Sequence, residues 1–244
     1  MNPPGLVYLI PSLLDEEGSH VIPAYIVDAV KQCQVFFVEN ERTARRFLKK
    51  IWKEMIIDNY EWHIIPQMNG ADGTSEKNRV VDLFRQRIKE DKTIGILSEA
   101  GCPGVADPGQ ALVAVAHEMN AQVRPLVGPS SLLLALMASG MNGQRFQFLG
   151  YLPIDNAART RAIRELENES QRNSCTQLFI ETPYRNNQLF AALINNCKPN
   201  TRLCLAVDLT GKQEWISTRT IAEWKKENPA IHKRPAIFLL SAGT

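Results

Sequence analysis

The sequence of 244 residues lacks any hydrophobic run long enough to cross a membrane. A spanning helix needs about 18 or more consecutive apolar residues. The longest run here, Leu132 to Ala138, has seven. The first residues, MNPPGLVYLIP, carry no basic side chain ahead of the apolar stretch, so we expect no secretory signal peptide. These absences predict a cytoplasmic protein without a membrane partner.

Patterns of metal ligands and disulfides are also missing. The five cysteines are odd in number and form no Cys-x-x-Cys pair, and the four histidines show no ligand spacing. We therefore expect reduced thiols and no metal site, which again fits the cytoplasm.

Neither sign of charge is in large excess. The 28 Lys and Arg residues against 26 Asp and Glu residues give a net charge of +2. A protein that bound nucleic acid through its overall charge would be more basic. A nucleic-acid partner would have to meet a local basic patch.

One such patch lies in residues 41–53 (ERTARRFLKKIWK), where six basic residues and one acid give a net charge of +5. The spacing predicts a helix with the basic side chains near one face, and Trp52 could stack on a base. An amphipathic helix with an ordinary solvated face explains the pattern equally well. The RNA-binding candidates are Arg42, Arg45, Arg46, Lys49 and Lys50.

The familiar nucleotide-binding motifs are absent. Gly211-Lys212 is followed by Gln213, so there is no Walker A motif, and no G-x-G-x-x-G follows the first predicted strand. An ordinary dinucleotide-binding domain and the common Rossmann-type methyltransferases are therefore disfavoured.

Short apolar runs alternate with longer amphipathic segments along the whole chain. Runs such as Val35 to Val38 and Thr93 to Leu97 are typical of strands in a parallel sheet, and helical patterns separate them. Near the C-terminus, two strands joined by Thr210 to Lys212 imply an antiparallel portion. We predict an α/β protein with mixed, mostly parallel sheets and flanking helices, in two domains at residues 1–127 and 128–244.

Two loops rich in Gly and Pro follow predicted strands. They are residues 98–109 (SEAGCPGVADPG) and 125–131 (PLVGPSS). Ligands of open α/β sheets lie beyond the carboxyl ends of the strands, so these loops are candidates for a binding site. A tight strand-to-helix connection with Asp107 as a cap, and a plain N-cap at Ser130 or Ser131, are the structural alternatives.

These loops, together with residues 146–153 (FQFLGYLP), 179–185 (FIETPYR) and 206–212 (AVDLTGK), resemble the tetrapyrrole methylase superfamily. Within it, the chain is most similar to the branch of ribosomal RNA small-subunit methyltransferase I. The resemblance extends over nearly the whole chain.

The resemblance implies a homodimeric methyltransferase that uses S-adenosylmethionine, bound in a cleft between two α/β domains. In that branch the acceptor is the ribose 2′-hydroxyl of a cytidine in 16S ribosomal RNA. Carried over by position, the cofactor-binding residues would be Pro11, Ala100, Gly101, Cys102, Pro103, Val105, Ala106, Gly128, Ser130, Ser131, Thr182, Ala206, Val207, Asp208 and Leu209.

Transfer to a hydroxyl also needs a proton acceptor or an electrostatic assist. The acids at motif positions, Glu39, Glu99 and Glu181, are the catalytic candidates, although each could instead form a cap or a salt bridge.

The first loop departs from the branch. A Gly-Asn pair is lost and Asp15-Glu16-Glu17 appears. Three carboxylates would repel a phosphate backbone unless they face solvent or pair with arginines. Two rivals to an RNA methyltransferase therefore stay open: methylation of a small molecule such as a tetrapyrrole, and a non-catalytic protein that binds S-adenosylmethionine.

Overall fold

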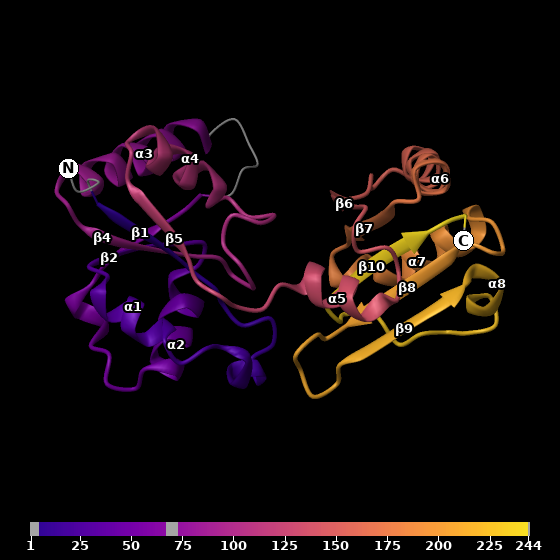
Figure 1. Cartoon of the computed structure of the whole chain (residues 1–244), viewed down its shortest axis with the longest axis horizontal. Helices are drawn as coiled ribbons and strands as arrows, with labels where there is room; N and C mark the ends of the chain where they lie inside the picture. The colour runs from indigo at the N-terminus through magenta and orange to yellow at the C-terminus, as the bar shows by residue number, and fades with distance from the viewer. Residues whose placement is uncertain (1–4, 67–72, 244) are drawn as a thin grey trace. The chain divides into compact units, whose positions relative to one another are not determined.

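The computed structural model describes residues 5–66 and 73–243 and divides the chain into two compact units, Met1–Ser130 and Ser131–Thr244 (Figure 1). The first unit contains five strands, β1 (Leu6–Ile10), β2 (Val35–Val38), β3 (Glu61–Ile64), β4 (Thr93–Leu97) and β5 (Gln122–Pro125). Its helices are α1 (Ile26–Gln32), α2 (Glu41–Ile51), α3 (Gly73–Lys89) and α4 (Gln110–Glu118), with short 3-10 turns at Gly18–Val21 and Ile57–Asn59.

The five strands of the first unit form one sheet in the order β3-β2-β4-β1-β5, and every pairing is parallel. Helices α1 and α2 cover one face, and α3 and α4 cover the other (Figure 1). Strand β2 shows why its sequence is continuously apolar: Phe36 and Val38 pack toward α1 and α2, whereas Val35 and Phe37 pack toward α3 and α4.

The second unit begins with α5 (Ser131–Ser139) and is built on a mixed sheet. Its strands are β6 (Phe146–Tyr151), β7 (Thr176–Ile180), β8 (Arg202–Val207), β9 (Trp215–Thr220) and β10 (Ala236–Ser241), and its other helices are α6 (Asn156–Asn173), α7 (Asn186–Asn196) and α8 (Ile221–Trp224), with a 3-10 turn at Pro183–Arg185. The strand order is β6-β7-β10-β8-β9.

In this second sheet, only the β6–β7 pairing among the described residues is parallel, and β7–β10, β10–β8 and β8–β9 are antiparallel. A core with Phe179, Leu205, Phe238 and Trp224 lies on one side of the sheet. The predicted α/β class with flanking helices is confirmed. The first sheet is parallel, and the predicted antiparallel portion takes up most of the second sheet.

All five cysteines are free thiols. In the part of the chain that the structure describes, no helix is long and apolar enough to span a bilayer. Over the same residues, no group of three His, Cys, Asp or Glu side chains is arranged to hold a metal ion.

Candidate functional site

The connections after β1 and β4 leave the first sheet toward opposite faces. Strand β1 leads to α1, whereas its neighbour β4 leads to α4 on the other side. Such a divergence opens a crevice at the carboxyl ends of adjacent strands, where ligands of open α/β sheets bind. The carboxyl ends of β1 and β4 are therefore the expected position of the site.

Ser12 links the two loops at this point. Its main-chain N–H donates to the Gly101 carbonyl at 2.8 Å, and its hydroxyl donates to the Ser98 carbonyl at 2.8 Å. Both serines are buried. The start of the first loop is thus held against the loop after β4.

The loop after β4 has an unusual backbone. Gly101, Gly104 and Ala106 have φ angles of 74°, 82° and 60°. A non-glycine residue such as Ala106 rarely adopts this region, and such conformations gather at functional sites. The Asp107 carboxylate accepts hydrogen bonds from the N–H groups of Gly104 at 2.7 Å and Gly109 at 2.6 Å. Asp107 therefore holds the loop itself, because the N-cap of α4 is Gly109.

The loop after β5 packs against the other two. A Cβ atom on Gly128 would lie 2.2 Å from the Pro11 Cβ, so only glycine fits there. The Cys102 thiol donates to the Pro129 carbonyl at 3.4 Å, and a Cβ on Gly101 would lie 3.3 Å from the same oxygen. The structure thus brings together Pro11, Gly101, Cys102 and Gly128 of the predicted cofactor residues.

The outer side of these loops is open. Val105 and Val127 are 51% and 70% exposed, which is high for valine, and Ala100 and Ala106 are exposed as well. The Cβ position of Gly104 has no atom within 4 Å. Apolar side chains beside accessible backbone groups suit a ligand with a flat apolar part and polar ends.

Two of the three predicted catalytic acids meet in this unit. Glu39, which follows β2, accepts a hydrogen bond from the Glu99 N–H at 2.8 Å. Partial burial raises the pKa of Glu39, and the nearby charges of Asp107 and Glu99 raise it further, against the lowering effect of this hydrogen bond. Glu99 is exposed. Glu39 is thus the acid in this pair whose environment favours proton uptake.

The third acid, Glu181, follows β7 in the second unit and has a fully buried side chain. Its Oε1 accepts hydrogen bonds from the Thr182 N–H at 2.7 Å and from Arg185 Nη2 at 2.6 Å, and its Oε2 has no hydrogen-bond partner. This ion pair holds the turn after β7.

Four of the predicted cofactor residues of the second unit lie in β8 or directly after it. Ala206, Val207 and Leu209 are buried. Asp208 has a φ of 49°, and its carboxylate accepts a hydrogen bond from Arg234 Nε at 2.7 Å. Ser131, the first residue of α5, belongs to this unit too, whereas Ser130 ends the first unit.

Helix α2 is amphipathic, with Phe47 and Leu48 buried beneath its charged face. Asn40 caps it, because its side-chain oxygen accepts hydrogen bonds from the N–H groups of Arg42 and Thr43. Trp52, the predicted base-stacking residue, packs partly against the core below α2 and carries the Lys31 ammonium over its ring.

The predicted RNA-binding cations of α2 differ in their partners. Arg45 pairs with Glu41 at 2.6 Å and lies over the ring of Trp62, and Lys49 donates to the Met55 carbonyl at 3.0 Å. Arg42 is exposed, and no ion pair of its side chain occurs within the described residues. Arg46 pairs with Glu16 at 2.6 Å.

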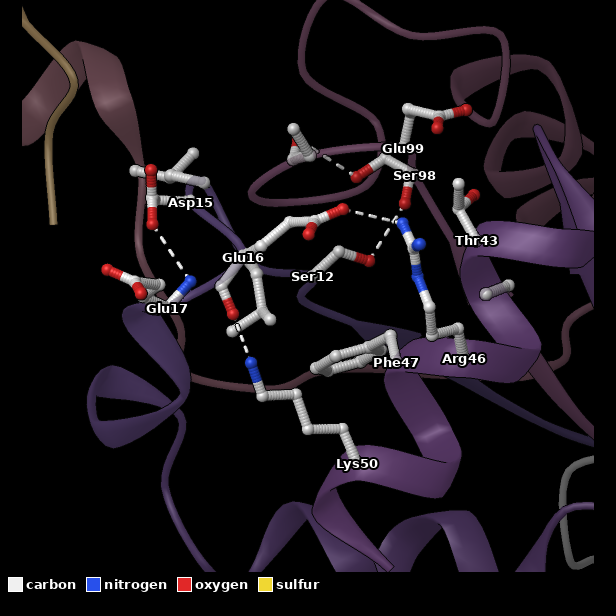
Figure 2. Close-up of a pocket in the computed structure, with 14 residues that line it drawn as sticks. Ser12, Asp15, Glu16, Glu17, Thr43, Arg46, Phe47, Lys50, Ser98 and Glu99 are labelled. Atoms are coloured by element: carbon white, nitrogen blue, oxygen red, sulfur yellow. Dashed lines mark hydrogen bonds and ion pairs between the residues drawn. The ribbon is translucent and has the colours of Figure 1, made fainter. Parts of the chain in front are cut away.

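A pocket of about 440 Å³ lies between the first loop, α2 and the loop after β4 (Figure 2). Its lining comprises residues 12–17, Thr43, Ala44, Arg46, Phe47, Lys50 and residues 98–100. The pocket was not predicted from the sequence. The sequence showed the acids of residues 15–17 and the basic helix as two separate features. No spacing rule predicts that side chains 30 residues apart lie next to each other.

The fold and the site define an α/β protein with Gly- and Pro-rich loops at the carboxyl ends of a parallel sheet, an arrangement typical of small-ligand sites. The model of the family described as Tetrapyrrole (Corrin/Porphyrin) Methylases matches residues 22–224, and the chain belongs to this family.

Relatives and solved structures agree with this assignment. The chain is 30% identical to "Ribosomal RNA small subunit methyltransferase I" of Vibrio cholerae serotype O1 over 96% of this chain and 76% of that protein. It is 26% identical to the protein of the same name from Buchnera aphidicola subsp. Schizaphis graminum, over 100% and 80%. The structure of the methyltransferase CobJ has a TM-score of 0.61 at 16% identity, covering 98% of this chain and 94% of that one. Uroporphyrin-III C-methyltransferase from Thermus thermophilus, complexed with S-adenosylhomocysteine, has a TM-score of 0.53 at 16% identity, covering 97% of both chains.

The chain is therefore a methyltransferase that uses S-adenosylmethionine, as the resemblance implied. The loops of the first unit have the chemistry and the space that this cofactor requires. The exposed apolar residues Val105 and Val127 suit an adenine ring, and the open space at Gly104 leaves room beside the loop backbone.

Proposed function

We propose that the chain methylates a ribose 2′-hydroxyl of RNA in the small ribosomal subunit. The observation that carries the proposal is the likeness to proteins named ribosomal RNA small subunit methyltransferase I over nearly the whole chain. The basic face of α2 supports an RNA substrate, because it borders the pocket that includes residues 98–100 of the loop after β4.

The cofactor supplies an electrophilic methyl group on a sulfonium, and the chain must align a nucleophile with it and accept a proton. We assign the loops around Pro11, Gly101 and Gly128 to the cofactor. Glu39 is the preferred proton acceptor, because its raised pKa makes it a better base than an ordinary carboxylate. The expected contributions of Glu181, Thr182 and residues 206–209 stay predictions.

The test supplies purified protein with methyl-labelled S-adenosylmethionine and small ribosomal subunits from a strain that lacks the endogenous enzyme. We expect label in the RNA at a nucleotide whose 3′ bond resists alkaline cleavage, since that cleavage needs a free 2′-hydroxyl. Heat-inactivated protein is the control. Label on a base, or no label in RNA, would contradict the proposal.

Methylation of a small molecule such as a tetrapyrrole is the second candidate. Two observations favour it: the likeness in fold to uroporphyrin-III C-methyltransferase, and the occupation of Arg46 by Glu16. To test this candidate, the protein is incubated with the same labelled cofactor and uroporphyrinogen III. Transfer of the methyl group would then place label in the tetrapyrrole fraction.

We also propose that the protein is a cytoplasmic homodimer. Free thiols at all five cysteines fit a reducing compartment, and the resemblance to the superfamily supports the dimer. Sedimentation equilibrium of the purified protein should give twice the chain mass of 27.4 kDa.

A further inference from the structure

The first loop provides an anionic partner for the basic helix. The Glu16 carboxylate lies 2.6 Å from Arg46 Nη2, and the Lys50 ammonium donates to the main-chain carbonyl of the same glutamate (Figure 2). Two cations of α2 thus converge on one residue that precedes them by 30 and 34 positions.

These three residues line the pocket of about 440 Å³, together with Ser98, Glu99 and Ala100. Ala100 belongs to the loop that we assign to the cofactor. An anion held by Arg46 and Lys50 would therefore lie in the same pocket as this part of the loop, where an acceptor must enter.

The ion pair between Glu16 and Arg46 can be replaced by another anion at low cost. The side chains of Glu16 and Arg46 are 81% and 61% exposed, and exposed ion pairs stabilise a protein little. Guanidinium groups bind carboxylates and phosphates through the same donors, so one anion can replace the other. In contrast, Ser12 at the start of the loop is buried and hydrogen-bonded, so the loop can release Glu16 without releasing Ser12.

We propose that Glu16 occupies the position of a substrate phosphate, with its carboxylate at Arg46 and its main-chain carbonyl at Lys50, and that a phosphate group of the RNA displaces it. This inference rests on the proposed function. It makes the part of the loop around Glu16, downstream of Ser12, an autoinhibitory segment that an isolated monoanion displaces poorly and a polyanion displaces well, because further phosphates add attraction along α2.

The test measures binding of a short fluorescent single-stranded RNA by anisotropy at several salt concentrations. Glu16→Gln should bind about two- to fivefold more tightly than the wild type, which is the range set by an exposed ion pair. Glu17→Gln removes the same charge from the same loop and leaves the Glu16–Arg46 pair in place, so it is the matched control and should change binding less.

The salt dependence should change as well. In the wild type, Arg46 is already neutralised by Glu16, so an incoming phosphate releases no counterion from it. In Glu16→Gln, the freed cation contributes to counterion release, and the slope of log K against log salt should steepen by up to about 0.7.

A double-mutant cycle assigns the effect to the pair. In an Arg46→Ala background, Glu16→Gln should give no more gain than Glu17→Gln. The proposal is overturned if Glu16→Gln and Glu17→Gln tighten binding equally, if neither does, or if the gain persists without Arg46.

A titration with inorganic pyrophosphate, followed by thermal unfolding, separates this proposal from the proposed function. Stabilisation of Glu16→Gln above the wild type and Glu17→Gln, with no variant methylating RNA, would support the anion position and refute the RNA substrate. RNA methylation combined with identical binding of RNA and pyrophosphate by all three proteins would support the RNA substrate and refute the proposed role of Glu16.

Discussion

Glu39 accepts a hydrogen bond from the main-chain N–H of Glu99 at 2.8 Å, and this contact joins the carboxyl ends of the neighbouring strands β2 and β4. The carboxylate is therefore fixed beside the loop that we assign to the cofactor. Its raised pKa follows from burial and from two acidic neighbours.

Glu39→Gln should lower kcat for methyl transfer at least about a hundredfold, because general-base catalysis contributes that much or more. Cofactor affinity should stay close to the wild type, since the amide oxygen can still accept from the Glu99 N–H. Single-turnover transfer and calorimetry check the two expectations. An unchanged rate would remove Glu39 as the proton acceptor.

The same assignment predicts a pH dependence. A base works only when deprotonated, so kcat/KM should fall as pH drops through the pKa of Glu39. Because that pKa is raised, the fall should occur above the ordinary glutamate value of about 4.3. The residual activity of Glu39→Gln should lack this acidic limb, and a limb that persists in the variant would belong to another group.

Gly101→Val should abolish measurable cofactor binding in calorimetry. The φ of 74° disfavours a β-branched side chain, and the new Cβ would lie 3.2 Å from the Leu14 Cδ2 and 3.3 Å from the Pro129 carbonyl. Gly143→Ala is the matched control, since nothing lies within 4 Å of its Cβ position and its φ is not positive. Equal affinity in Gly101→Val and the wild type would place the cofactor elsewhere.

Asp107→Ala should lower the free energy of unfolding by about 2–3 kcal/mol, because the N–H groups of Gly104 and Gly109 lose a charged acceptor. Asp107→Asn retains one acceptor oxygen, so its free energy of unfolding should lie between those of the wild type and Asp107→Ala. Urea denaturation measures the stability, and calorimetry follows the parallel loss of cofactor affinity. Full stability in Asp107→Ala would show that the loop holds its shape without this side chain.

Replacing Arg42 and Lys49 together by Ala should weaken RNA binding and flatten its salt dependence by up to about 1.4 in slope, which corresponds to two phosphate contacts on a single strand. Both side chains are exposed on α2. Lys225 and Lys226, exposed in the second unit, provide a control pair with the same change of charge. Equal effects of the two double variants on RNA binding would show that the charged face of α2 is an ordinary solvated surface.

The elements of the fold were predictable because a sheet covered on both faces leaves continuous apolar runs in the sequence. Strands β2 and β4 have the predicted bounds. The short helix α8 was missed, although Thr220 and Glu223 form a capping box whose Thr-x-x-Glu spacing was visible.

The site was predictable only where backbone conformation demands particular residues. Gly and Pro marked the loops that meet at Gly101 and Gly128, because a Cβ atom at either glycine would crowd its neighbours. Side-chain pairs such as Glu16–Arg46 join exposed residues of separate segments. Their partners depend on tertiary placement, and no periodicity encodes it.

The buried hydrogen bonds of Ser12 divide the first loop into two parts with different freedom to vary. Upstream of this residue, Pro11 fits against Gly128, and any change there would disturb the loops that we assign to the cofactor. Downstream, the acids of residues 15–17 lie on one wall of an open pocket, so substitutions there can reshape the entrance at a smaller cost to folding than at Leu13, which packs against the core. Residues 15–17 are therefore the natural segment to randomise when new acceptors are sought, because they line the pocket without belonging to the loops that we assign to the donor.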